Sequence, residues 1–330
     1  MSFITDIKQK YQEIKDDRQF ANDRNKAITM SKNFLMTLFR IVIIVGISYI
    51  IIGPLIGIIS SAFFSNADKY NPMVYVIPQN PTLERFKLAI LRLDYWKGLR
   101  NILIYDGTIM ILQVLICSMV GYGFARFDFP FKKVLFGLVV VMIILPSNTI
   151  MLPLYVTFRQ FDIFGIITAI RGAPINLMNS PFPMILMTLF GCGLRAGLFI
   201  YIFNQFFRGL PKEIEEAAFV DGAGMWYTYF RIMLVNAIPS VITVAVFSLV
   251  WQYNDLFYAK LFLIPDNIVI SKKISSLAAT ISAVDQIKDP SIVQLYNYAG
   301  ILLIMLPVIV IYVVLQKFFI EGVERSGIVG

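Results

Sequence analysis

The side chains that most often carry chemistry are scarce in this sequence. Histidine is absent, which excludes Ser-His-Asp and Cys-His catalysis and every metal site that needs an imidazole. The two cysteines, Cys117 and Cys192, stand far apart in apolar stretches, where core packing is a more common role than a disulfide or a ligand pair. No G-x-x-x-x-G-K-[ST] motif occurs, so the chain has no phosphate-binding loop of that type. We therefore expect no bond chemistry, no metal and no cofactor bound by this chain.

Ionisable and small residues gather in one short stretch, GLPKEIEEAAFVDG. Pro211 suits the first position of a helix, because the N–H group that proline lacks is not needed there. The positive end of the helix dipole favours acidic residues in the first turns; here these are Glu213, Glu215 and Glu216. Gly222, after Asp221, can adopt a positive φ and end the helix. Because Ala217 and Ala218 are small, the stretch predicts either a helix that presses into a groove of another protein or an ordinary solvated turn.

The segments around this stretch have the composition of membrane helices. Hydrophobic residues make up 58% of the 330 residues and charged residues 15%, with a mean hydropathy of +0.72, whereas soluble domains are about 45–50% apolar and about 25% charged. Six windows contain no Asp, Glu, Lys or Arg: 41–67, 107–125, 134–158, 172–194, 232–254 and 290–316. A membrane-spanning helix needs about 20 mostly apolar residues, and these windows lack the alternation of barrel strands. The expected fold class is all-α, a polytopic membrane protein with six transmembrane helices.

The windows also predict how the chain is organised. Arg195 interrupts the fourth window and the apolar pattern resumes after it, which places the fourth helix at about 184–206. The predicted parts are a cytosolic N-terminal arm (1–33), the six-span domain (34–320) with its loop at 207–231, and a cytosolic C-terminal tail (321–330). Six spans put both termini on one side of the membrane, together with the loops at 126–133 and 207–231. The loop at 126–133 is basic, and short basic loops tend to stay in the cytoplasm. Both termini are therefore expected in the cytoplasm.

Four residues of the apolar segments are candidates for lining a translocation path. An arginine exposed to lipid costs about 2.5–3.5 kcal/mol on insertion scales. Arg195 therefore either faces the interior of the bundle or, if the fourth span ends at 194, lies at the membrane interface. Trp251, Tyr253 and Asn254 could stack on a sugar and bond to it. An aromatic belt at the interface explains the tryptophan and the tyrosine equally well.

A longer stretch, EEAAFVDGAGMWYTYFRIMLVNAIP at 215–239, resembles the EAA loop of type I ABC importer permeases. Further similar stretches are NPTLERF, GYGFARFDFPFKK, FNQFFRGLP, VWQYNDLFYAKLFL and QKFFIEGVERSGIVG. From about residue 35 to its end, the chain is similar to the carbohydrate permeases of the maltose-transporter MalG-like branch. The resemblance implies that the stretch forms a cytoplasmic coupling helix that docks on an ATPase. The coupling residues that it implies are Glu213, Glu216, Ala217, Ala218, Asp221, Gly222 and Ala223.

The resemblance also implies partners and a location. The chain would form half of the translocation path for a carbohydrate, with an oligosaccharide favoured, and would not be an enzyme. Its expected partners are a second, homologous permease subunit, two cytosolic ATPase subunits that bind ATP and Mg, and an extracellular or periplasmic solute-binding protein. The complex is expected in the bacterial cytoplasmic membrane, and no nucleic-acid partner is expected. Two positions depart from the family pattern: Val235 stands where a proline is common, and Val329 where a lysine is common.

Two other functions remain compatible with the pattern. One is an ABC permease for a solute that is not a sugar. The other is an ion-coupled carrier or a channel, which predicts buried acidic groups and inverted repeats. The charge-free windows contain no carboxylate, which argues against the second function.

Overall fold

The protein is helical throughout the part that the structure describes. This computed structural model describes the backbone of residues 2–327 and the side chains of residues 30, 32–314 and 316. Between residues 2 and 327 no strand forms, and the backbone makes one isolated antiparallel bridge, between Phe161 and Ile175. The predicted all-α fold class is confirmed. Val329 and the end of the predicted tail lie outside the described residues.

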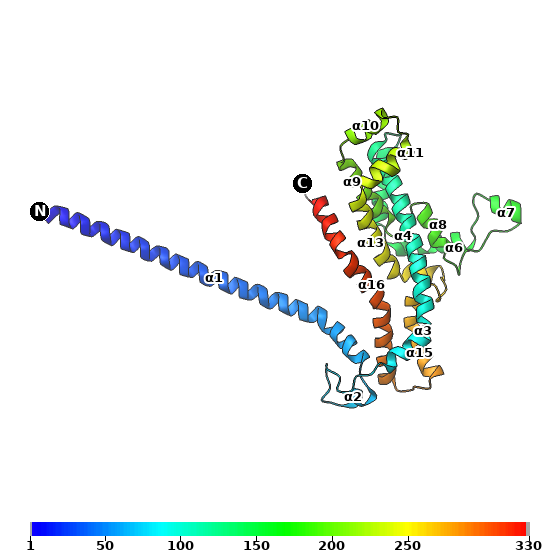
Figure 1. The fold of residues 1–330 in the computed structure, drawn as a ribbon, viewed down its shortest axis with the longest axis horizontal. Coiled ribbons are helices and arrows are strands. Elements are labelled where there is room, and N and C mark those ends of the chain that lie inside the picture. The colour runs from blue at the N-terminus through cyan, green and yellow to red at the C-terminus, as the bar shows by residue number, and fades with distance from the viewer. Residues whose placement is uncertain (1, 328–330) are drawn as a thin grey trace. The chain divides into compact units, whose positions relative to one another are not determined.

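Figure 1 shows the order of the helical segments along the chain. They are α1 (Ser2–Ala62), α2 (Asn66–Tyr70), α3 (Glu84–Leu93), α4 (Tyr95–Arg126), α5 (Lys132–Ile144), η1 (Ser147–Ile150), α6 (Met151–Arg159), α7 (Ile166–Arg171), α8 (Phe182–Leu189), α9 (Ala196–Gly209), α10 (Glu213–Val220), α11 (Met225–Tyr227), η2 (Thr228–Met233), α12 (Leu234–Asn236), α13 (Ile238–Tyr253), α14 (Phe257–Leu261), η3 (Ile270–Lys273), α15 (Ile274–Val284) and α16 (Pro290–Gly327). Of these, η1 and η3 are 3₁₀-helices and η2 is a π-helix.

The chain divides into two units, which are described separately. The first contains residues 2–61 and 75–77 and consists mainly of α1, which continues through Pro54. Its part from Lys32 to Ala62 is long and apolar enough to cross a membrane, with a mean hydropathy of 2.7. None of that most apolar window is buried within the chain, so its side chains are free to face lipid or another subunit. The predicted arm, from residue 2 onward, is the first part of this same helix.

The second unit contains two further helices that are long enough to span a membrane. These are α4 and the part of α16 from Pro290 to Val314. Two other apolar windows form bent pairs: α5 with η1 and α6, bent by 105°, and the segment Met225–Asn236 with α13, bent by 78°. Proline stands beside each bend, at Pro146 and Pro239, and it removes a hydrogen-bond donor and clashes with the preceding turn. If each bent pair is one span, the described residues hold up to five spans of this kind, and the count of six stays a prediction.

The prediction of one continuous fourth helix at 184–206 is wrong. The structure has two helices there, α8 and α9, and the segment between them turns through positive φ at Gly191 (70°) and at Arg195 (60°). The broken backbone leaves carbonyl groups without partners inside the helix, and neighbouring helices must supply donors for them. The Gln113 side-chain amide of α4 donates to the Leu194 carbonyl at 2.7 Å. The break is therefore a built feature of the bundle.

Helix α4 is the element against which α9 and α13 pack. Its closest approach to α9 is at Gly121, where an added Cβ would lie 2.6 Å from the Phe203 Cβ and 3.0 Å from the Asn204 nitrogen. The Asn204 amide donates to the Gly121 carbonyl at 3.3 Å. Small residues at such points let two helix backbones approach closely in a membrane.

The two ends of α4 carry different structures. Helices α10 and α11 lie at the end where α4 finishes at Arg126, while α3 and α15 lie at the end where it begins at Tyr95 (Figure 1). A helix of this length spans about 48 Å at about 1.5 Å per residue, which is enough to cross a bilayer. The two sets of short helices are therefore placed to lie on opposite sides of the membrane.

The close approach at Gly121 predicts that even one methyl group is harmful there. Gly121→Ala forces the α4 and α9 backbones apart, and overpacking of this kind costs about 1–3 kcal/mol. Gly123→Ala is the matched control, since nothing lies within 4 Å of its added Cβ, and alanine favours the helix by about 1 kcal/mol. Thermal unfolding of the purified protein in detergent is the measurement. We expect a lower melting temperature for Gly121→Ala alone; equal values for the two variants would contradict the packing.

Candidate functional site

The acidic stretch of the sequence forms the short helix α10. It begins at Glu213 after the cap residue Lys212, so Pro211 lies before the helix and not at its first position. Its first turn contains three acidic side chains, as the helix dipole favours. The helix ends at Asp221, and Gly222 follows with a φ of 81°. The predicted positive φ at Gly222 is confirmed.

A buried ion pair holds α10 against the end of α4. The Arg126 Nε lies 2.9 Å from the Glu215 Oε2, and the two side chains are only 6% and 9% exposed. The Tyr122 hydroxyl donates to the other carboxylate oxygen of Glu215. The Arg126 Nη2 also donates to the Leu210 carbonyl at 2.9 Å. Arg126 thus binds both α10 and the end of the segment that leads to it, and α10 is fixed to α4 at two points.

The predicted coupling residues do not share one face of α10. Glu213, Glu216 and Ala217 are exposed, as are Asp221 and Gly222 just beyond the helix. Ala223 is half-buried. Ala218, by contrast, is 5% exposed, on the side from which α10 contacts η2. Consecutive helical residues point about 100° apart, so the two alanines serve different surfaces. The small side chain of Ala218 lets α10 approach its own chain.

An apolar surface continues from α10 into α11, which sequence reasoning missed. Its members are exposed and large: Phe219, Val220, Met225, Trp226 and Tyr227. Contiguous exposed apolar side chains mark surfaces that bind proteins or lipid. The signal in the sequence was the pair Phe-Val and the run Met-Trp-Tyr on the two sides of the Asp-Gly stop. We call these five residues the apolar surface of the loop.

Two of the candidate path residues, Arg195 and Trp251, lie together. Arg195 is the cap residue of α9, and its side chain is exposed. Its guanidinium carbon lies 5.5 Å from the centre of the Trp251 ring, within the range of a cation–π contact. The Trp251 ring stacks on Phe247, with centroids 4.9 Å apart, and on Phe199, with centroids 5.7 Å apart. The arginine therefore rests on a fixed aromatic stack.

The other two candidates lie elsewhere. Tyr253 is buried, and its hydroxyl donates to the Ile304 carbonyl of α16 at 2.8 Å. It joins α13 to α16 and faces no open space, so the structure does not support its predicted position on the path. Asn254 is exposed, and its amide donates to the Val250 carbonyl of its own helix at 2.8 Å.

A cavity of ≈ 400 Å³ opens at the break before α9. Its walls come from α5, η1 and α6 on one side, from residues 192–198 on the other, and from Tyr258 of α14. The polar side chains that line it are Ser147, Thr157, Cys192, Arg195 and Tyr258. Cys192, expected in the core, is exposed here. The volume lies within the range of about 300–1,000 Å³ that is typical of small-molecule sites.

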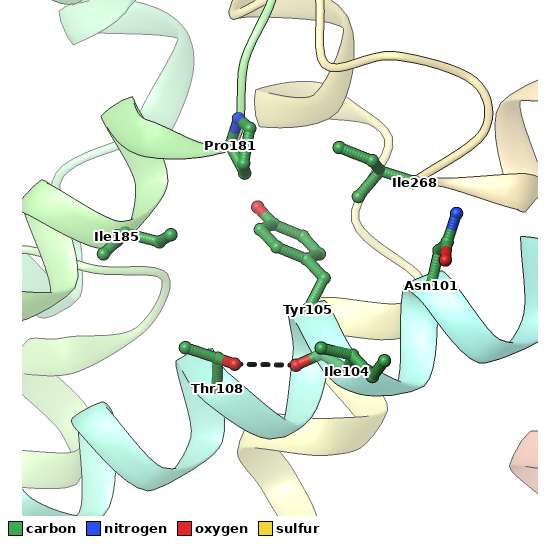
Figure 2. A pocket seen from close by; sticks show the side chains of 7 residues that line it. All are labelled: Asn101, Ile104, Tyr105, Thr108, Pro181, Ile185 and Ile268. Carbon is green, nitrogen blue, oxygen red and sulfur yellow. Dashed lines mark hydrogen bonds between the residues drawn. The ribbon is translucent and has the colours of Figure 1, made fainter.

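A second cavity, of ≈ 270 Å³, lies beside the first half of α4. Figure 2 shows the Tyr105 ring within it, with Pro181 and Ile185 on one side and Ile268 on the other. Its polar groups already have partners within the chain: the Thr108 hydroxyl donates to the Ile104 carbonyl at 2.8 Å, and the Asn101 amide donates to the Asn267 carbonyl at 2.7 Å. Because polar groups in use cannot orient a ligand, the cavity beside Arg195 is the stronger candidate site.

Asp106 is a buried acidic residue that the charge-free windows did not reveal. It is 1% exposed within α4, one residue before the window at 107–125. Its carboxylate oxygens have no hydrogen-bond partner among the described residues. The expectation that no carboxylate lies inside a span is therefore wrong, because α4 begins at Tyr95, well before the window. A polar interface between α4 and α13 continues from it, with the pairs Tyr105–Gln252 and Gln113–Ser248.

A bundle of apolar helices with broken spans around a cavity, and with an anchored helix at one end, is the architecture of a membrane permease. Residues 114–325 match the family model described as "binding-protein-dependent transport system inner membrane component". The match covers more than half of the chain, and the protein belongs to this family. It is therefore a transport subunit, a permease component, and its family does not consist of enzymes.

Curated relatives extend the similarity along most of the chain. A probable ABC transporter permease of Pyrococcus horikoshii is 27% identical over 84% of this chain and 92% of its own length. The arabinooligosaccharide transport permease of Halalkalibacterium halodurans is 25% identical over 86% and 93%. The melibiose/raffinose/stachyose import permease of Bacillus subtilis is 26% identical over 78% and 84%.

A solved structure is also similar. It is a bacterial ABC transporter that imports the acidic polysaccharide alginate, and the match has a TM-score of 0.67 and 19% identity over 86% of this chain and 96% of that chain. At this identity the match shows that the fold is shared. The all-α type I ABC transmembrane fold implied by the resemblance of the sequence is confirmed.

The buried ion pair predicts that two neighbouring glutamates of α10 respond differently to the same change. Glu215→Gln leaves the Arg126 charge buried without its partner, and breaking a buried pair in this way costs about 3–5 kcal/mol. Glu216→Gln is the matched control, because Glu216 is exposed and exposed substitutions usually change stability by less than about 0.5 kcal/mol. Hydrogen exchange of the α10 amides is the measurement. Faster exchange is expected for Glu215→Gln alone, and the same rates in both variants would contradict the anchor.

Proposed function

We propose that this chain is one of two permease subunits of an ATP-driven importer for a carbohydrate. The second subunit is a related but distinct permease, and two cytosolic ATPase subunits bind ATP and Mg. A solute-binding protein outside the cell delivers the carbohydrate. This chain contributes half of the translocation path and makes no bond itself.

The observation that carries the proposal is the way α10 is held. The helix is fixed to α4 through Glu215 and Arg126, yet it exposes Glu216 and Ala217. An exposed helix that is rigidly attached to the bundle can transmit a push from a partner, whereas a loosely attached one would only swing. The apolar surface of the loop adds contact area next to it. The proposed docking surface for the ATPase is therefore Glu213, Glu216, Ala217, Asp221 and Gly222 together with that apolar surface, and Ala218 and Ala223 support it from behind.

The orientation proposed for the chain follows from the two ends of α4. The end at Arg126 continues into the basic loop at 126–133, and basic short loops favour the cytoplasm. Both termini and α10 are placed on the same side in this topology. Helices α3 and α15, at the other end of α4 (Figure 1), then face the outside, where a solute-binding protein approaches.

A carbohydrate is proposed as the solute because named relatives transport carbohydrates. They include permeases for arabinooligosaccharides, for diacetylchitobiose and for melibiose, raffinose and stachyose. The cavity beside Arg195 supports this class, since it combines apolar walls with the hydroxyl groups of Ser147, Thr157 and Tyr258. Sugars present both hydroxyl groups and apolar C–H faces, and such a lining contacts both.

The proposed mechanism is alternating access driven by the partner. Closure of the ATPase pair moves α10, and the ion pair carries the movement to α4. The helices that pack on α4 then move with it, and the cavity opens on one side of the membrane and closes on the other. The energy enters because the ATPase pair binds one arrangement of the permeases more tightly than the other.

The topology predicts opposite labelling of two exposed positions. After Cys117 and Cys192 are replaced by serine, a cysteine at Ser275 in α15 should react with a membrane-impermeant maleimide in intact cells. A cysteine at Lys212 should react only after the cells are opened, because it lies at the α10 end. Both positions are exposed in the structure, so accessibility within the chain does not limit either reaction. The reverse pattern would invert the orientation and remove the ATPase from α10.

The docking surface predicts that a bulky charge at Ala217 separates the subunits. Ala217→Arg should leave the permease inserted and folded, because Ala217 is exposed, but it should block close approach of the ATPase. We expect at least a tenfold loss of ATPase that co-purifies with the permease, and a matching loss of uptake.

Ser275→Arg is the control for this variant, since it adds the same side chain at the opposite end of α4. It should retain the ATPase. Full retention by Ala217→Arg, together with normal uptake, would sink the assignment of α10 as the docking helix. Ala218→Arg is a different case, because the buried position makes misfolding of the loop the expected result.

A further inference from the structure

Arg195 brings a positive charge into the membrane part of the bundle without an acid to balance it. The ion pairs that form among the described residues do not include it. The cavity beside it is lined by no Asp, Glu or Lys, so its guanidinium is the only formal charge there. An unbalanced charge in an apolar site is costly, and a ligand of opposite charge removes that cost.

A second source of positive potential faces the same cavity. Helix α9, of 14 residues, begins directly after Arg195, and no side chain caps its first N–H groups. Its first residues, Ala196, Gly197 and Leu198, line the cavity. The N-terminal end of a helix carries a partial positive charge and free N–H donors, both of which favour anions. The helix end and the guanidinium therefore act on the same space.

The backbone at Arg195 is held in a conformation that arginine does not prefer. Its φ of 60° lies in the left-handed region, which glycine adopts at little cost and residues with a Cβ avoid. Unfavourable backbone conformations of this kind gather at ligand sites. The neighbouring positions Gly191 and Gly193 do carry glycine. An arginine at 195 thus points to a need for its side chain.

Depth in the bilayer agrees with a site on the path. The Leu194 carbonyl is bonded by Gln113 of α4, and Gln113 lies about 20 Å along the helix from Arg126, at about 1.5 Å per residue. Substrate sites of transporters commonly lie near the middle of the membrane, where helices are interrupted and their N-terminal ends point at anionic groups.

We infer that the cavity beside Arg195 binds the carboxylate of an acidic oligosaccharide, one that contains uronate units. This inference rests on the proposed function, since it names the class of carbohydrate. The planar guanidinium matches a carboxylate with two parallel hydrogen bonds. One positive charge balances one carboxylate, whereas a phosphate monoester carries nearly two negative charges and would leave one unbalanced. The hydroxyl groups of Ser147, Thr157 and Tyr258 are placed to bond the sugar hydroxyls.

The test uses the complete transporter, with its partner permease, ATPase subunits and binding protein, in proteoliposomes. The probes are trisaccharides in matched pairs: the uronates of galactose, mannose and glucose, and the same three compounds with their carboxyl groups reduced to alcohols. ATP-dependent uptake of each probe is measured. We expect uptake of at least one uronate to exceed that of its reduced counterpart by tenfold or more.

Three variants of Arg195 separate its charge from its backbone. Arg195→Gln should lower uronate uptake by about ten- to a hundredfold, the effect of losing one charged hydrogen-bonding partner. Arg195→Lys keeps the charge and should stay within about threefold of the original protein. Arg195→Gly relaxes the positive φ, so it should fold at least as stably and still lose uronate uptake. The last variant shows that a loss comes from the missing charge and not from misfolding.

Two outcomes would overturn the inference while the proposed function stands. One is uptake of the reduced trisaccharides equal to or above that of the uronates. The other is unchanged uronate uptake by Arg195→Gln. Absence of ATP-dependent uptake for every trisaccharide would contradict the proposed carbohydrate function itself, and the inference with it.

Discussion

The second unit depends on the contacts that one face of α4 makes inside the bilayer. Near its middle, Gln113 donates to the Leu194 carbonyl before α9 and accepts from Ser248 of α13. At its end, Arg126 pairs with Glu215 of α10. Between these points Gly121 lets α9 approach closely. Because hydrocarbon offers no water to replace these hydrogen bonds, their partners must stay in place, and α4 fixes the positions of α9, α10 and α13 together.

The same constraint explains how a broken helix can be stable in this position. Interrupting the fourth span frees backbone groups, each of which costs several kcal/mol in lipid when it has no partner. Gln113 satisfies the Leu194 carbonyl, and the Cys117 thiol lies 3.8 Å from the Ala196 carbonyl. With its carbonyls satisfied by α4, the segment can turn its amides and Arg195 toward the cavity. The polar face of α4 is thus the condition for a charged site within an apolar bundle.

Sequence reasoning found the elements whose signal is local and missed those that depend on distant partners. The composition predicted the all-α fold, and the Asp-Gly pair predicted the positive φ at Gly222. Hydropathy could not reveal the break at Arg195, because a window measures polarity and carries no information on φ. The inward direction of Glu215 depends on Tyr122 and Arg126, which are about ninety residues away along the chain. Likewise, Tyr253 was expected at an open surface, and only its bond to Ile304 of α16 shows why it is buried.

The two sites are joined by one helix, and this has a thermodynamic consequence. A displacement of α10 must move the Arg126 end of α4 or break a buried ion pair, and a movement of α4 must displace Gln113, on which the backbone next to Arg195 depends. The contact of α10 with η2 adds a second link, toward α13. A partner that prefers one position of α10 therefore prefers one shape of the cavity. Linkage is reciprocal, so a solute that binds in the cavity changes the affinity of α10 for its partner by the same factor. In this arrangement the solute and the partner on α10 control each other without touching.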